Sequence, residues 1–92
     1  MDLDRRVKPS MHQLSCEWGD HVAILNLGSG SFYQLDSVAA CVWGLVQQKD
    51  VTVRAIIDAV LAEYEVSRSQ CENDILALLE NLEMEGLIQT VS

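Results

Sequence analysis

The chain has 92 residues, of which 49% are apolar, and its 14 acidic residues against six basic ones give a formal charge of −8. This length is that of one domain. It contains no run of about 18 apolar residues to span a membrane and no apolar signal peptide at its N-terminus. Three of the six basic residues lie among the first eight positions, so the rest of the chain would repel nucleic acid, whose non-specific binding depends on cationic contacts. The three cysteines are far apart, which argues against a disulfide framework and favours a cytoplasmic chain with reduced thiols.

The N-terminal segment is polar and charged before a strand pattern begins. We expect residues 1–10 to be a flexible N-terminal arm and residues 11–92 to form a single folded domain. Residues 11–17 alternate as a first strand would, with Leu14 and Cys16 on the side that we expect to face the core.

Two further strands follow, joined by a glycine-rich turn. Residues 18–20 predict a turn, and residues 21–27 are apolar and β-branched enough for a strand that is buried on much of both faces. Residues 28–30 are Gly-Ser-Gly and predict a hairpin loop, because glycine adopts the positive φ that such turns need. Residues 31–35 are the return strand.

Three capped helices complete the chain. Asp36, Thr52 and Ser67 are predicted N-caps, and each precedes an apolar stripe at helical spacing. We expect the first helix to end before residues 49–50. Gly86 predicts the C-terminal stop of the third helix, and the tail after it would fold back onto the core.

The element order therefore predicts an α+β fold in which a three-stranded antiparallel sheet is followed by three helices. The second and third helices are joined by a tight turn and resemble a helix-turn-helix. With the strands attached, the architecture is winged-helix-like, with the wing at the N-terminus. Such a fold leaves a free strand edge beside a helix face, which suits an extended peptide.

The residues that could carry chemistry form no convincing catalytic or metal site. His12, Cys16 and His21 could offer three metal ligands, but their spacing matches no familiar zinc pattern. Cys41 and Cys71 lie within apolar helix stripes, where cysteine behaves as a small hydrophobic residue. We therefore expect no catalytic residue, no metal and no cofactor.

Two nucleotide-binding interpretations are also disfavoured. Residues 28–31 are rich in glycine, but they lack the lysine of a phosphate-binding loop and precede a strand where such a loop would precede a helix. Residues 67–85, the helix that would enter a DNA groove, carry five acidic residues and Arg68 as their single cation. DNA-reading helices present basic and amide side chains instead.

A few side chains are better candidates for contact with a peptide. Phe32 and Tyr33 point to opposite sides of the return strand, so only one of them can be fully interior. Asp74 lies on the flank of the third helix together with Leu78 and Asn81, where it would hold a cation or a backbone donor of a partner.

The ordered set of these features resembles the PqqD-like family of peptide chaperones, whose domain is also called the RiPP precursor peptide recognition element. The resemblance spans about residues 12–90. It is carried by the strand Val22 to Leu27, the glycine turn, Phe32-Tyr33-Gln34-Leu35-Asp36 leading to Val42-Trp43, Thr52-Val53 with Ile56, Leu61 to Tyr64 with Val66, Cys71-Glu72-Asn73-Asp74-Ile75, Leu78-Leu79, Leu82 and Gly86-Leu87-Ile88.

Within that family, the Phe-Tyr-Gln-Leu-Asp stretch looks most like the stand-alone leader-binding proteins of lasso-peptide biosynthesis. It is less like the chaperone of pyrroloquinoline quinone synthesis, which stays an alternative, and a winged-helix DNA-binding regulator is a more distant one. The resemblance implies a non-catalytic adaptor that binds the leader segment of a ribosomally made precursor peptide. Its implied enzyme partners are a separate cysteine protease and an ATP-dependent macrolactam synthetase.

The resemblance also implies which residues would contact the leader peptide. The leader would add as an antiparallel strand at the edge of the return strand, and its apolar side chains would lie between that strand and the third helix. The peptide-binding residues implied in this way are Ser31, Phe32, Tyr33, Gln34 and Leu35 on the strand and Asp74, Leu78 and Asn81 on the helix. A shift of the helix face by one residue would bring in Leu79 instead.

Overall fold

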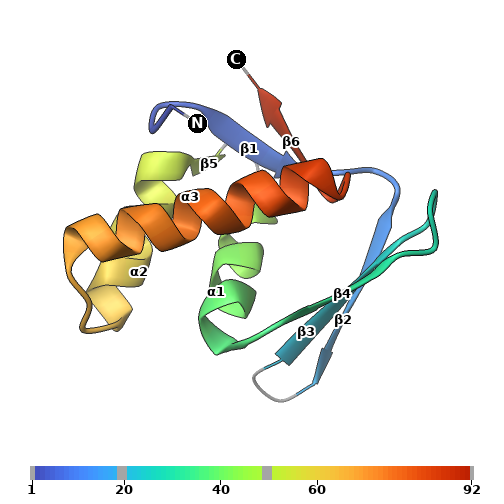
Figure 1. Cartoon of the computed structure of the whole chain (residues 1–92), viewed down its shortest axis with the longest axis horizontal. Helices are drawn as coiled ribbons and strands as arrows, with labels where there is room; N and C mark the ends of the chain where they lie inside the picture. The colour runs from blue at the N-terminus through green and yellow to red at the C-terminus, as the bar shows by residue number, and fades with distance from the viewer. Residues whose placement is uncertain (1, 19–20, 49–50, 92) are drawn as a thin grey trace.

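The computed structural model describes residues 2–18, 21–48 and 51–91. The predicted turn at residues 18–20 therefore lies partly outside the described residues. The first helix ends at Val46, before residues 49–50 as predicted. The elements, in chain order, are β1 (Arg6–Pro9), β2 (Gln13–Trp18), β3 (His21–Asn26), β4 (Phe32–Leu35), α1 (Ser37–Val46), β5 (Val51–Thr52), α2 (Val53–Glu63), α3 (Arg68–Met84) and β6 (Ile88–Val91) (Figure 1). In these ranges one sheet has the order β2-β3-β4 and the other β5-β1-β6. The predicted α+β, winged-helix-like architecture is confirmed, and a second small sheet is added to it.

The second sheet corrects the prediction of a flexible N-terminal arm. β1 pairs antiparallel with β6 along its whole length and with β5 through Arg6 and Val7, so the strands near the two ends of the chain lie side by side (Figure 1). Val7 is fully buried in the core. The predicted arm is therefore wrong over Arg6–Pro9. A short polar strand is stabilised here by partners that are distant in sequence, and local composition carries no sign of them.

The sheet β2-β3-β4 buries one of its faces. Two successive cross-strand rows are Ser15, Ile24 and Tyr33, and then Leu14, Leu25 and Phe32. The face of Ile24 meets the helices and Ile24 is fully buried, whereas Leu14 and Cys16 are exposed on the opposite face. The predicted inward direction of Leu14 and Cys16 is wrong. Alternation decides which residues share a face, but the register against β3 decides which face meets the helices.

The hairpin between β3 and β4 has the predicted glycine turn. Gly30 has a φ of 76°, in the left-handed region that glycine adopts without strain. The side chain of Asn26 organises the loop, because its Oδ1 accepts hydrogen bonds from the backbone N–H groups of Gly28 and Ser29 at 2.9 and 3.2 Å. Its Nδ2 donates to the carbonyl of Glu85 at 2.6 Å. This one side chain thereby joins the hairpin to the end of α3.

The predicted helix ends are confirmed. The three cap side chains accept hydrogen bonds as follows: Asp36 from Ala39 N–H at 2.9 Å, Thr52 from Ala55 N–H at 3.1 Å, and Ser67 from Gln70 N–H at 3.3 Å. Each such cap typically contributes about 1 kcal/mol to stability. Gly86 follows α3 with a φ of 74°, and Leu87 and Ile88 after it are buried as predicted.

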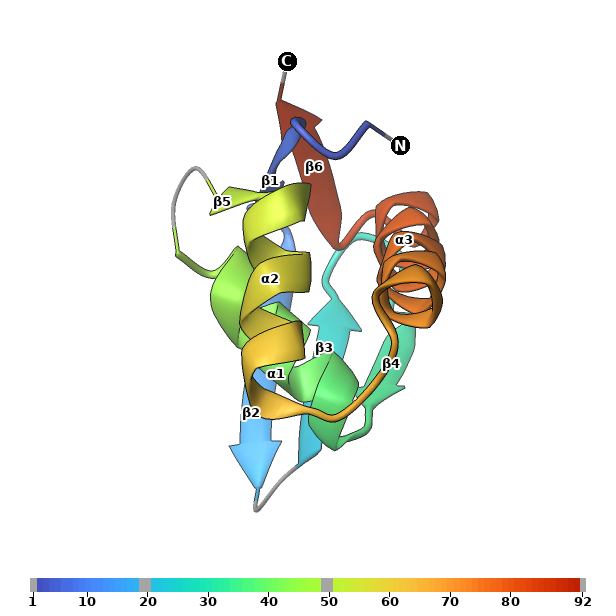
Figure 2. The ribbon, with the colours of Figure 1, turned by 90° about the vertical axis from the view of Figure 1, so that its left-hand side faces the viewer.

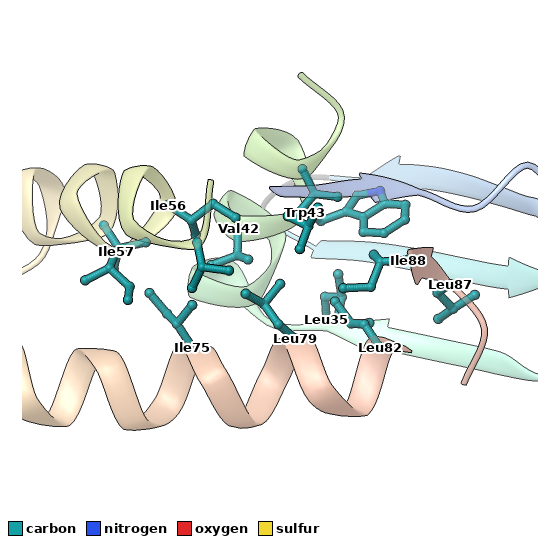
Figure 3. Close-up of a cluster of buried hydrophobic side chains, with 14 of the residues drawn as sticks. Leu35, Val42, Trp43, Ile56, Ile57, Ile75, Leu79, Leu82, Leu87 and Ile88 are labelled. Atoms are coloured by element: carbon teal, nitrogen blue, oxygen red, sulfur yellow. The ribbon is translucent and has the colours of Figure 1, made fainter. Parts of the chain in front are cut away.

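The core lies where the three helices meet the inner face of β3 and β4 (Figure 2). Its large side chains come from α1 (Val42 and Trp43), α2 (Ile56 and Ile57), α3 (Ile75, Leu79 and Leu82), β4 (Leu35) and the tail (Leu87 and Ile88) (Figure 3). Leu79 is fully buried at the centre of this cluster. The buried stripe of α3 fixes which of its side chains stay on the flanks and remain available for contacts with a partner.

Candidate functional site

The strand β4 leaves one of its edges open. Within the described residues, its one hydrogen-bonded neighbour is β3. The N–H of Asn26 donates to the carbonyl of Ser31 at 2.8 Å. Residues that exchange such bonds alternate with residues that do not in an antiparallel pair. Counting from Ser31, the backbone groups of Tyr33 and Leu35 therefore turn toward β3.

Phe32 and Gln34 consequently present their backbone N–H and C=O groups at the open edge. On the far side of β3, the N–H of Leu27 donates to the carbonyl of His12 at 2.9 Å, which fits the same alternation. An unpaired row of strand N–H and C=O groups is a template for a further strand. Figure 2 shows that β4 is the strand of its sheet on the side of α3.

A pocket of about 400 Å³ lies beside the end of β4. It is formed by the first two turns of α1, the end of α2 with the loop after it, and residues 71–78 of α3. Its lining residues are Asp36, Val38, Ala39, Val42, Val60, Tyr64, Val66, Cys71, Asp74, Ile75 and Leu78. Most of these side chains are apolar, and the exceptions include the carboxylates of Asp36 and Asp74. The pocket therefore suits an apolar side chain and has negative charge at its lining.

The predicted peptide-binding residues of α3 lie in different surroundings. Asp74 and Leu78 both line the pocket. Leu79, the alternative for a shifted face, is fully buried in the core and cannot meet a ligand without rearrangement. Asn81 is exposed on α3, further along the helix than the pocket-lining residues.

The predicted peptide-binding residues of the return strand also differ in their burial and backbone pairing. Ser31 precedes β4 and accepts the bond from Asn26. Leu35 is buried in the core, so its side chain faces away from any peptide at the edge. Tyr33 is half-buried and packs against the core, while Phe32 and Gln34 are exposed.

Sequence reasoning assigned no ligand-facing role to several residues of the pocket. Asp36 was predicted as a helix cap, which it is, and its carboxylate also lines the pocket. Tyr64 entered the sequence analysis only among the residues that carry the family resemblance. Val38 and Val66 are 38% and 45% exposed, and only the folded chain shows that these two valines remain partly accessible beside helix ends.

The buried Cys71 and the half-buried Cys41 lack the properties of nucleophiles. Burial raises the pKa of the Cys71 thiol, and the neighbouring Asp74 carboxylate raises it further. Burial likewise raises the pKa of Cys41, with a second contribution from Glu63. Reactive cysteines need the opposite shift, toward the thiolate. Neither thiol is therefore suited to nucleophilic attack, and Cys71 belongs to the hydrophobic core.

Alkylation should distinguish the three thiols. We expect iodoacetamide at mildly alkaline pH to modify the exposed Cys16 first, because a raised pKa leaves Cys41 and Cys71 with a smaller thiolate fraction at any pH below that pKa. Mass spectrometry over time should show one early adduct, and peptide mapping should place it on Cys16. Three adducts forming at one rate would contradict this expectation, and unfolding the chain first is the control that should equalise the rates.

Two other kinds of site are not found among the residues that the structure describes. In that part of the chain, no group of three His, Cys, Asp or Glu side chains is arranged to hold a metal ion. None of the described helices combines the length and the apolar character needed to cross a bilayer.

An open strand edge beside a mainly apolar pocket is typical of the class of domains that bind extended peptides. The chain belongs to the PqqD family, because the family model described as coenzyme PQQ synthesis protein D matches residues 21–88. The domains of this family are non-catalytic and bind peptides.

Solved structures match the fold closely. The structure described as TbiB1 in complex with the TbiA(beta) leader peptide is 30% identical, with a TM-score of 0.85 over 92% of this chain and 98% of that one. The structure described as lasso peptide synthetase B1 complexed with the leader peptide is 23% identical, with a TM-score of 0.80 over 90% of this chain and 96% of that one. A comparison with curated proteins finds no match.

Proposed function

We propose that this chain is an adaptor that binds the leader segment of a ribosomally made precursor peptide and presents it to modifying enzymes. The observation that carries the proposal is the open edge of β4 beside a pocket lined by α1, α2 and α3. A similar chain, TbiB1, is described in complex with a leader peptide. The cytoplasmic location expected from the sequence is part of this proposal.

The leader would bind as a fourth, antiparallel strand of the sheet. Its backbone would exchange hydrogen bonds with Phe32 and Gln34, whose backbone groups face the open edge. Alternate side chains of the leader would then point toward the helices, where the pocket with Asp74 and Leu78 takes an apolar residue. Backbone pairing would give affinity, and the pocket would give sequence preference.

Lasso-peptide biosynthesis is the pathway class that we propose for this adaptor. Both structural matches are described with leader peptides, and one is described as a lasso peptide synthetase component. The enzyme partners would then be a leader-processing protease and a macrolactam synthetase. The family description favours a second candidate, a chaperone for the pyrroloquinoline quinone precursor peptide.

Fluorescence anisotropy with labelled leader peptides tests the proposal. We expect saturable binding of the leader encoded with this chain, and no saturable binding of a scrambled leader or of duplex DNA. A pyrroloquinoline quinone precursor peptide in the same titration separates the two candidates. If the folded protein binds no leader, the proposed function is wrong, and DNA binding at low salt would revive the regulator alternative.

A further inference from the structure

The outer face of the sheet β2-β3-β4, which points away from the helices, carries an exposed apolar surface. Leu14, Leu25 and Phe32 form one row across all three strands. Leu14 is 62% exposed and Phe32 is 63% exposed. Leu27, which is 58% exposed, lies next to this row, because its N–H pairs with the carbonyl of His12. We call the surface formed by Leu14, Leu25, Leu27 and Phe32 the outer apolar face.

Among the residues whose side chains the structure describes, no carboxylate, lysine or arginine alternates onto this side of the sheet. The residues that alternate onto it include His12, Leu14, Cys16, His21, Ala23, Leu25, Leu27, Phe32 and Gln34. None of these is Asp, Glu, Lys or Arg, although the whole chain has 14 acidic and six basic residues. Clustered exposed apolar side chains without charges are typical of the centre of a protein–protein interface.

The outer apolar face and the pocket lie on opposite sides of the sheet. The pocket is lined by the helices, which cover the inner face. A strand added to β4 would direct alternate side chains to each side. Those pointing outward would stand beside Phe32 and extend its row by one more strand, so the bound peptide and the outer apolar face would form one continuous surface.

We propose that the outer apolar face is the docking surface for the leader-processing protease that acts on the bound peptide. The proposal rests on the proposed function, since a peptide bound at the open edge of β4 is what would extend the outer apolar face. A second copy of the chain is a poorer occupant, because two bodies with a formal charge of −8 each repel one another. A protease bound to this face would contact both this chain and the outward side chains of the bound peptide.

The docking surface is tested by Leu14→Asp, with Met84→Asp as the matched control. Leu14 lies on β2, the strand farthest from the open edge of β4. Met84 is an exposed apolar residue, 83% accessible, at the end of α3, where it lies on a surface with Arg5, Glu80 and Thr90. The probe is the purified leader-processing protease encoded with the precursor, titrated by biolayer interferometry onto each variant with and without saturating leader. Leader affinity is measured separately by anisotropy.

We expect Leu14→Asp to weaken protease binding by about tenfold or more, the effect of truncating one interface anchor, while leader affinity stays within about twofold. Met84→Asp should change neither affinity. Leader-loaded protein should also bind the protease more tightly than free protein. Leu14→Ser gives the same comparison with a smaller change, and thermal melts of both variants control for folding.

The possible outcomes separate the docking surface from the function on which it rests. Equal protease affinities for the Leu14 and Met84 variants would overturn the docking surface, although leader binding had been found. So would wild-type self-association that Leu14→Asp abolishes, since a second copy would then occupy the face. Absence of leader binding by the wild type is a different result, which contradicts the proposed function itself.

Discussion

Gln34→Pro is expected to weaken leader binding by about tenfold or more. The backbone N–H of Gln34 faces the open edge of β4, so proline removes a donor to the added strand and places its ring against the incoming peptide. One net hydrogen bond of about 0.5–1.5 kcal/mol accounts for up to about tenfold, and the steric contact adds to it. Anisotropy titration with the labelled leader measures the effect.

Gln34→Ala is the matched control, because it removes the same side chain and keeps the N–H. We expect it to bind leader nearly as well as the wild type. Both variants should retain helical circular dichroism, since proline is tolerated where a strand edge faces outward. Tyr33→Pro should differ from both by lowering the melting temperature, because the N–H of Tyr33 faces β3. Equal leader affinity of the Gln34 proline and alanine variants would mean that the peptide does not pair with this edge.

Leu78 and Leu79 are adjacent on α3, but their replacement by alanine is expected to affect different properties. Leu79→Ala should lower stability, and Leu78→Ala should weaken leader binding. Leu79 is fully buried in the core, so its truncation should cost about 2–5 kcal/mol of unfolding free energy. The melting temperature should fall by roughly 10 °C or more. Leu78 is half-buried and lines the pocket, so its truncation should weaken leader binding by about tenfold and change stability far less.

Thermal melts and leader titrations of both variants make this comparison, with titrations run well below each melting transition. The folded fraction of Leu79→Ala should bind leader with nearly normal affinity. A Leu78→Ala variant that binds leader normally would show that the peptide does not use the pocket. Loss of stability in both variants to the same extent would contradict the assignment of faces on α3.

Local signals in the sequence were enough for the helices and the hairpin. Asp36, Thr52 and Ser67 cap helices as predicted, because a cap depends on a side chain and a backbone N–H a few residues away. Gly30 and Gly86 have the positive φ that their positions suggested. The return strand was placed correctly for the same reason, since its partner directly precedes it in the chain.

Features that depend on contacts between segments distant in the chain were predicted less well from the sequence. The polar residues of β1 gave no sign of pairing with β6, which is contributed by the other end of the chain. Alternation in β2 was visible, but its direction was predicted wrongly, and the exposure of Leu14 was missed for that reason. For the candidate site, sequence and resemblance together named Asp74 and Leu78, whereas Asp36 and Tyr64 joined the pocket only in the folded chain.

The sequence by itself determined the elements, their caps and turns, and the acidic charge that disfavours nucleic acid, because these depend on neighbouring residues or on composition alone. The tertiary structure decided three further features: which face of the sheet is covered, that Leu78 and not Leu79 lines the pocket, and that Asp36 and Tyr64 join that pocket. Each of these depends on how elements that are distant in the chain pack together. Periodicity gives the residues that share a face, and only packing against a partner decides which face is buried.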